Sequence, residues 1–139
     1  MTTVTGSSRA RTLLAAVLLC ALCITTASAQ DQVPELTQRV NDFAGVIDAR
    51  SRETIDALGS ALQRASGDVI VVATVPTFKP YADIREYAVR LFANGGRGIG
   101  TRGMDNGLLI LLAVDDRQVW IEVGYGLEPI ITDGFAGET

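Results

Sequence analysis

Two apolar runs separated by a short polar turn dominate the hydropathy pattern of this chain. Leu108–Val114 is continuously apolar, which is typical of a strand buried on both faces. Gln118–Val123 predicts a second strand, with Val119, Ile121 and Val123 on one face and Trp120 and Glu122 on the other. Asp115 and Asp116 between them favour a tight turn, because their side chains can hydrogen-bond to their own backbone. The pattern therefore predicts an antiparallel hairpin.

The predicted hairpin brings two polar loops to the same end of the sheet. Asp105-Asn106-Gly107 precedes the first strand, and Gly124-Tyr125-Gly126 follows the second. Since an antiparallel strand returns along its partner, the two loops should be neighbours. A strand of this length spans roughly 23 Å, so Asp115 at the far end cannot share a small site with Asp105.

One helix and one strand are predicted before the hairpin. Asp48 can cap a helix that Gly67 ends, and Val69–Val75 is an apolar, β-branched strand that Pro76 stops. The apolar positions of this helix share one face and should be buried: Ile55, Leu58, Leu62 and Ala65.

A second helix is predicted between the two apolar strands. Asp83 with Glu86 makes a capping-box start, and Asn94-Gly95-Gly96 ends the helix. Its expected buried positions are Ile84, Ala88, Leu91 and Phe92. The order helix, strand, helix, strand, strand predicts an α/β fold with helices covering a small sheet, in which the first two strands are parallel.

The N-terminal 29 residues have the layout of a secretory signal peptide. Two arginines precede the apolar stretch Leu13–Ile24, and Ala27-Ser28-Ala29 matches the signal peptidase pattern, with cleavage before Gln30. The apolar run is short of the roughly 20 residues that a membrane span needs, although an uncleaved anchor is the alternative. Cys20 and Cys23 lie inside this stretch, so the exported domain should fold without disulfides.

The remaining chain is expected to form one domain. Residues 30–36 are polar and predict a linker, and residues 37–139 predict the domain itself. Within it, Arg39–Ile47 is expected to be an ordered loop that packs through its apolar residues, namely Val40, Phe43 and Val46. Thr132 or Asp133 is expected to cap a last helix that has barely begun at Thr139.

Charge and composition exclude several classes of function. After residue 29 the chain holds 16 acidic and 10 basic residues, a net charge of −6, which argues against nucleic acid or an anionic membrane surface as partner. The acidic excess permits cation binding. The chain has no histidine, which excludes the serine triad and histidine-ligated zinc.

The glycine-rich segment Gly98–Gly103 matches the letters of a dinucleotide fingerprint but not its context. Such a fingerprint follows a strand and opens a helix, whereas here a predicted helix precedes it and a predicted strand follows. We therefore interpret the segment as a flexible connector that needs no cofactor.

Four short motifs, taken together in this order and spacing, resemble the TPM domain family over roughly Val33–Thr139. They are Val40–Ile47, Val72–Pro76, Asp105–Gly107, and Asp115–Arg117 followed by Ile121–Glu128. The family consists of exported bacterial domains and relatives in the thylakoid lumen linked to photosystem II repair. The resemblance implies a Rossmann-like α/β/α sandwich, an acid-lined groove for a divalent cation, and the acid phosphatase activity described for plant relatives. Family members usually continue with a complete helix, and often with a membrane span.

The predicted site lies where the two loops of the hairpin meet. Carboxylate and amide oxygens suit Ca²⁺ or Mg²⁺, and the candidate ligands are Asp42, Asp105, Asn106 and Glu128. Four further residues are expected to set the loop geometry, namely Gly107, Gly124, Tyr125 and Gly126. The alternative is that the two loops are only a turn and a bend.

Two functions remain open at this stage. The first is a cation-binding accessory or assembly module for membrane complexes of the periplasm or cell envelope, in some cases tethered to the membrane in a longer gene product. The second is a metal-dependent acid phosphatase that hydrolyses phosphomonoesters, with Asp105 orienting water or acting as nucleophile. Arg102 and Arg117 are the nearby basic candidates for phosphate. Acids that serve only solubility are a third possibility.

Overall fold

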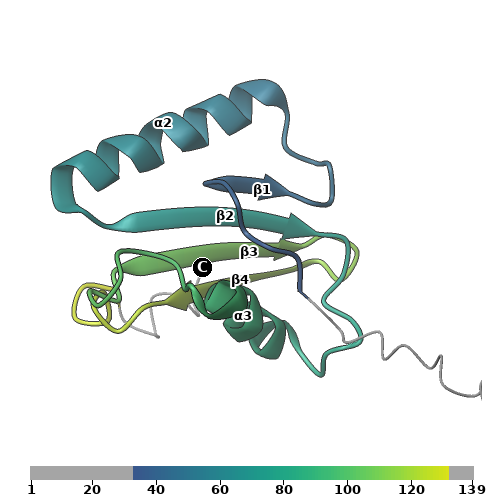
Figure 1. The fold of residues 1–139 in the computed structure, drawn as a ribbon. Helices are drawn as coiled ribbons and strands as arrows, with labels where there is room; N and C mark the ends of the chain where they lie inside the picture. The colour runs from purple at the N-terminus through teal and green to yellow at the C-terminus, as the bar shows by residue number, and fades with distance from the viewer. Residues whose placement is uncertain (1–32, 132–139) are drawn as a thin grey trace, which may run out of the picture. The chain divides into compact units, whose positions relative to one another are not determined.

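A four-stranded mixed sheet with a helix on each face forms the described part of the protein. The computed structural model describes residues 33–131. Its elements are β1 (Val40–Asp42), α2 (Ala49–Ser66), β2 (Val69–Val75), α3 (Ile84–Ala93), the short 3-10 helix η1 (Asn94–Gly96), β3 (Gly107–Ala113) and β4 (Gln118–Val123). The strand order is β1-β2-β3-β4, with β1, β2 and β3 parallel and β4 antiparallel to β3 (Figure 1). The predicted α/β class with a small mixed sheet is confirmed. The antiparallel hairpin, which we expected at the centre of the fold, instead forms one side of the sheet, with β4 as its edge strand.

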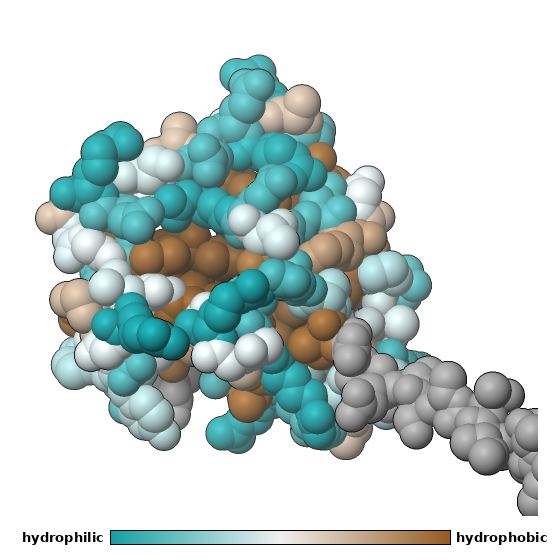
Figure 2. Space-filling model, in the orientation of Figure 1, coloured by the Kyte–Doolittle hydropathy of each residue, from teal (hydrophilic) through white to brown (hydrophobic). Residues whose placement is uncertain are grey.

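The core lies between the sheet and α3. Alternate residues of β2 and β3 point to this face, as the two-residue period of a strand requires. Leu109 and Leu111 are fully buried there, and Leu91 of α3 is fully buried against them. The capping interaction predicted for α3 is present, since the amide of Glu86 donates to Asp83 Oδ1 at 2.8 Å. Figure 2 shows apolar side chains gathered at the centre of the view, with polar side chains around them.

The other face carries α2, which covers only part of the sheet. The helix begins after Asp48 and ends at the left-handed Gly67, as predicted. It contacts β1 and β2 but neither β3 nor β4. The predicted buried stripe is wrong, because Leu58 and Leu62 are 68% and 37% exposed. The buried residue of the helix is instead Gly59, which packs against the Arg39 side chain just before β1, where a Cβ atom would lie 2.5 Å from that side chain.

The segment before α2 packs more closely than the linker prediction implies. Leu36 is buried, and its backbone amide and carbonyl both bond to the Asn94 side chain, at 2.9 and 3.1 Å. Val40 is buried in the short strand β1, whereas Phe43 and Val46 are exposed rather than packed. The domain fold therefore includes Val33–Leu36, part of the segment expected to be a linker.

Two predictions fall outside the described residues. The signal peptide lies in residues 1–29, and the start of a last helix at Thr132 or Asp133 follows the last described residue. Within residues 33–131, no helix is both long enough and apolar enough to cross a membrane.

Candidate functional site

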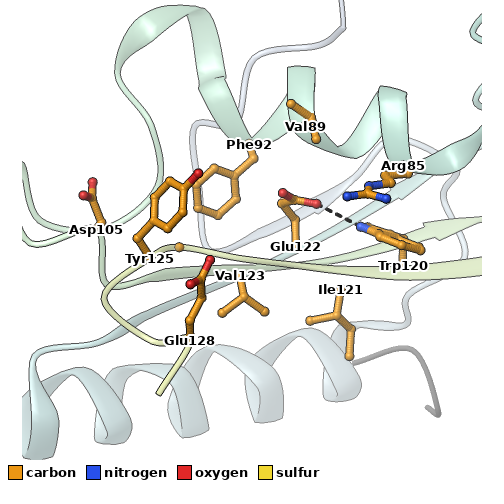
Figure 3. Close-up of a pocket in the computed structure, with 11 residues that line it drawn as sticks. Arg85, Val89, Phe92, Asp105, Trp120, Ile121, Glu122, Val123, Tyr125 and Glu128 are labelled. Atoms are coloured by element: carbon orange, nitrogen blue, oxygen red, sulfur yellow. Dashed lines mark hydrogen bonds between the residues drawn. The ribbon is translucent and has the colours of Figure 1, made fainter. Parts of the chain in front are cut away.

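The two loops that flank the hairpin are neighbours, as the sequence predicted. The amide of Gly124 donates to the carbonyl of Gly107 at 2.8 Å, and the amide of Gly126 donates to the carbonyl of Asp105 at 3.0 Å. The return strand β4 therefore ends beside the start of β3. This junction is where Asp105, Tyr125 and Glu128 lie (Figure 3).

Glycine is needed at this junction because backbones approach each other closely. A Cβ atom on Gly124 would lie 2.2 Å from the Asp105 carbonyl oxygen, and one on Gly126 would lie 2.3 Å from that of Met104. A Cβ atom on Gly107 would similarly lie 2.1 Å from the Ile99 carbonyl oxygen. Real side chains do not tolerate such distances, so these glycines set the geometry of the loops.

The Asn106 side chain stabilises the fold and is not exposed at the surface. It is buried, its Oδ1 accepts from the amide of Thr101 at 2.8 Å, and its Nδ2 donates to the carbonyl of Gly67 at 2.8 Å. The glycine-rich segment Gly98–Gly103 folds against it between α3 and β3, which agrees with the predicted connector. Asn106 Oδ1, which the sequence suggested as a cation ligand, therefore already accepts a hydrogen bond from the glycine-rich loop.

Asp42 lies at the other end of the sheet from Asp105. It pairs in register with Thr74 and, through it, with Leu112 near the end of β3, whereas Asp105 precedes the start of β3. The part of β3 from Gly107 to Leu112 alone spans roughly 17 Å along the strand, and Asp105 lies beyond it. Because β1 runs parallel to β3, a residue at the end of β1 cannot reach the loop that opens β3.

The Asp42 side chain is buried and fully engaged. It accepts hydrogen bonds from the Thr74 hydroxyl and from the amides of Val46 and Ile47, at 3.1 and 3.0 Å for the amides, and pairs with Arg52 at 3.5 Å. Burial is the largest single influence and raises the pKa of Asp42. The bonds from Thr74, Ile47 and Val46 and the charge of Arg52 together lower this pKa below its ordinary value of 3.8. Asp42 therefore organises the turn between β1 and α2.

A groove of about 710 Å³ lies between α3 and β4 and includes the loop junction (Figure 3). Asp105, Tyr125 and Glu128 line one end of it. The other residues that line it come from α3, from β4 and from the position directly after β4: Arg85, Val89, Phe92, Trp120, Ile121, Glu122, Val123 and Gly124. Consecutive residues of β4 point to opposite faces of the sheet, so a space that touches four of them opens onto the outer edge of the strand.

The groove combines aromatic surface with an excess of negative charge. Tyr125 is 79% exposed, and the Arg85 guanidinium lies 5.9 Å from the centre of the Trp120 ring. Trp120 Nε1 donates to Glu122 Oε2 at 2.9 Å. Among the described residues that line the groove, carboxylates from Asp105, Glu122 and Glu128 thus outnumber the one cation, Arg85.

Of the four predicted ligands, the structure brings only Asp105 and Glu128 into one groove. In the part of the chain that the structure describes, no group of three or more acidic, histidine or cysteine side chains could hold a metal ion. Arg102 lines a separate hollow of about 340 Å³ together with Asp105. Arg117 lies in the turn at the far end of the hairpin, where its amide donates to Val114.

The sequence reasoning missed the α3 wall of the groove. Arg85, Val89 and Phe92 lie at helical spacing on one face of α3, and this spacing was the available signal. It also missed a contact of the hairpin turn, where Asp116 Oδ2 accepts a hydrogen bond from the amide of Phe78 at 2.9 Å. The turn therefore fixes the loop that follows β2.

Comparisons with known proteins agree with this fold. A family model described as the TPM domain matches residues 40–139. A solution structure of the N-terminal domain of a protein from P. gingivalis is 29% identical, with a TM-score of 0.64, over 73% of this chain and 63% of that one. The N-terminal domain of the cg2496 protein from Corynebacterium glutamicum is 24% identical, with a TM-score of 0.54, over 76% and 64%. This chain thus spans less than two thirds of either structure, and no curated protein matches it.

Proposed function

Because this chain belongs to the TPM domain family, we propose that it is an exported accessory module that binds a partner protein in the groove between α3 and β4. In this proposal the partner belongs to a membrane complex of the cell envelope, and the module assists its assembly or repair without catalysing a reaction. The signal-peptide pattern of residues 1–29 supports export.

The composition of the groove supports a protein partner. Tyr125 exposes most of its ring to solvent, and Phe92 and Trp120 line the same space. Aromatic side chains rimmed by polar groups are characteristic of protein interfaces, where they supply much of the binding energy. The acidic rim would add specificity and speed association with a basic partner.

Site-specific photo-crosslinking in the envelope tests this proposal. A benzoylphenylalanine at Tyr125 should give a reproducible adduct with one partner, whereas the same group at Phe43 should not. Phe43 is a matched control, because it is also an exposed aromatic residue but follows β1 at the other end of the sheet. Charge reversal by Glu128→Lys should abolish the adduct. The same adducts from both positions, or none from Tyr125, would refute the proposal.

Divalent cation binding is part of the proposal at the Tyr125 end of the groove. Asp105 and Glu128 offer two carboxylates there, whereas Ca²⁺ takes six to eight oxygen ligands, so water or the partner would supply the others. A ligand that binds only the native state raises the melting temperature. Calcium should therefore raise the Tm of the chain, and less so for Asp105→Asn. An equal rise in both proteins would place the cation elsewhere.

Phosphomonoester hydrolysis is the second candidate function. It is favoured by one observation, namely that Asp105 and Arg102 line the same hollow and so could serve a phosphoryl group together. Hydrolysis of p-nitrophenyl phosphate with Mg²⁺ should then fall sharply in Asp105→Asn and stay unchanged in Asp115→Asn, a control at an exposed aspartate in the turn at the far end of the hairpin. Equal rates in the parent and in Asp105→Asn would eliminate this function.

A further inference from the structure

Apart from one charged residue, Glu122, the outer edge of β4 lacks the features that usually protect a sheet edge. Natural edge strands are kept short or carry lysine, proline or bulges. The opposite edge, β1, has only three residues, and the Val40 carbonyl accepts a hydrogen bond from Arg52 Nη1 at 3.1 Å. In contrast, β4 has six residues, Gln118–Val123, with neither lysine nor proline. Within residues 33–131, no element pairs with its outer side.

The hydrogen-bond pattern identifies which backbone groups of β4 face outward. The amide of Gly124 donates to Gly107 of β3, and inward-facing residues alternate along an antiparallel strand. Glu122 and Trp120, opposite Leu109 and Leu111, therefore also bond inward. The backbone N–H and C=O groups of the three intervening residues point away from the sheet. These residues are Val119, Ile121 and Val123.

The groove lies along this same edge. It contacts consecutive residues of β4 on one side and the outer surface of α3, at Val89 and Phe92, on the other. Figure 3 shows Trp120 and Glu122 on the side of α3, and Ile121 and Val123 on the opposite side of the strand. An added strand would therefore find apolar contacts on both of its faces.

Charge decides between two possible occupants. Within residues 33–131, three carboxylates and one guanidinium line the groove, and that guanidinium, of Arg85, already lies over the Trp120 ring. A second copy of this chain would bring the same carboxylates together across a two-fold axis, and like charges oppose each other. A segment with lysine or arginine would instead neutralise Asp105 and Glu128.

We propose that β4 is a docking edge to which an extended segment of a partner protein adds as a fifth strand, with basic side chains toward Asp105 and Glu128. The segment would bond to the outward N–H and C=O groups of Val119, Ile121 and Val123. This inference rests on the proposed binding function and specifies how the partner is recognised.

Amide hydrogen exchange of the full chain with a synthetic peptide tests the proposal. The probe is acetylated Arg-Val-Thr-Val-Arg-Val-Thr-amide. Its binding should slow exchange at Val119, Ile121 and Val123 by about 10-fold or more, while the inward amides of Trp120 and Glu122 change little. A twin peptide N-methylated at alternate residues of its pairing edge should bind at least about 10-fold more weakly. A second twin with glutamate in place of arginine should weaken binding similarly.

Protein variants separate backbone recognition from loss of a side chain. Val119→Pro removes one outward N–H at a half-exposed position and leaves the ladder to β3 intact, so it should weaken peptide binding. Val119→Ala is the matched control, because it shortens the side chain but keeps the N–H, and it should bind the peptide nearly as well. Asp105→Asn should weaken the binding of the arginine peptide more than it weakens the binding of an uncharged twin peptide.

Several results would overturn the proposal. These are equal affinity for the N-methylated twin, equal binding by Val119→Pro and Val119→Ala, or no slowing at the outward amides. Slow exchange at these amides in the free monomer would show that another part of the same chain already occupies the edge. Slow exchange in a protein that sediments as a dimer would show that a second copy occupies it. If crosslinking at Tyr125 captures a partner but the peptide tests fail, the binding function stands and strand addition is wrong.

Discussion

Replacing Asp42 with asparagine should destabilise the protein strongly, although the two side chains have the same shape. The buried carboxylate accepts three hydrogen bonds and pairs with Arg52. Both carboxylate oxygens of Asp42 accept hydrogen bonds, whereas an asparagine side chain has only one oxygen. Its NH₂ group must therefore face another donor, such as the backbone N–H of Ile47, and that hydrogen bond is lost. A lost bond to a charged group and an unsatisfied amide together cost about 2–4 kcal/mol of unfolding free energy. The half-exposed Arg52 adds little, since exposed ion pairs are weak.

Urea denaturation of the parent, Asp42→Asn and Asp48→Asn measures this cost. Asp48→Asn is the matched control, because asparagine caps a helix as well as aspartate does, and it should leave stability unchanged. The pKa of Asp42 is lowered by folding, so its contribution is present above its ordinary value of 3.8 and is lost as the pH falls through the lower, folded pKa. The difference between parent and Asp42→Asn should therefore shrink in acid. A pH-independent difference, or equal stability of the two asparagine variants, would refute the reasoning.

Three further predictions concern packing and burial. Gly126→Ala should cost about 1–3 kcal/mol in urea unfolding, because its Cβ would lie 2.3 Å from the Met104 carbonyl oxygen. Leu91→Ala should cost about 2–5 kcal/mol, whereas Leu58→Ala, at a position 68% exposed, should change the urea midpoint little. Burial raises the pKa of Tyr87 to about 12, so stability should fall as the pH rises from the ordinary value of 10 towards 12. Ultraviolet titration should show this late ionisation, and Tyr87→Phe should remove the associated loss of stability.

The sequence was most informative where local signals and burial agree. The bounds of β2 and β4 match their prediction, and β3 both begins and ends one residue earlier than expected. Asp48 and Asp83 cap their helices as the sequence indicated, since capping depends on residues within one turn. The contact between the two loops could then be predicted as well, because in an antiparallel hairpin the end of the second strand lies beside the start of the first.

The sequence was least informative where the outcome depends on what lies across the fold. Periodicity placed Leu58 and Leu62 on a buried face, but it carries no information about how much of the sheet α2 covers. Asp42 was expected to join Asp105 from the loop near the start of the domain. Only the parallel pairing of β1 with β2 shows that they lie at opposite ends of the sheet.

The adjacent residues Asp105 and Asn106 show why a motif alone cannot identify a ligand. Both offer oxygen atoms suited to a cation, and both belong to the loop that opens β3. The Asn106 amide turns inward and bonds to the backbone of Thr101 and Gly67, whereas the neighbouring Asp105 takes a left-handed backbone, with φ of +49°, and lines the groove. The buried member fixes the loop so that the exposed member is presented at a constant position. Removing Asn106 would therefore weaken any function of Asp105 indirectly, and only variants of Asp105 and Glu128 report on binding itself.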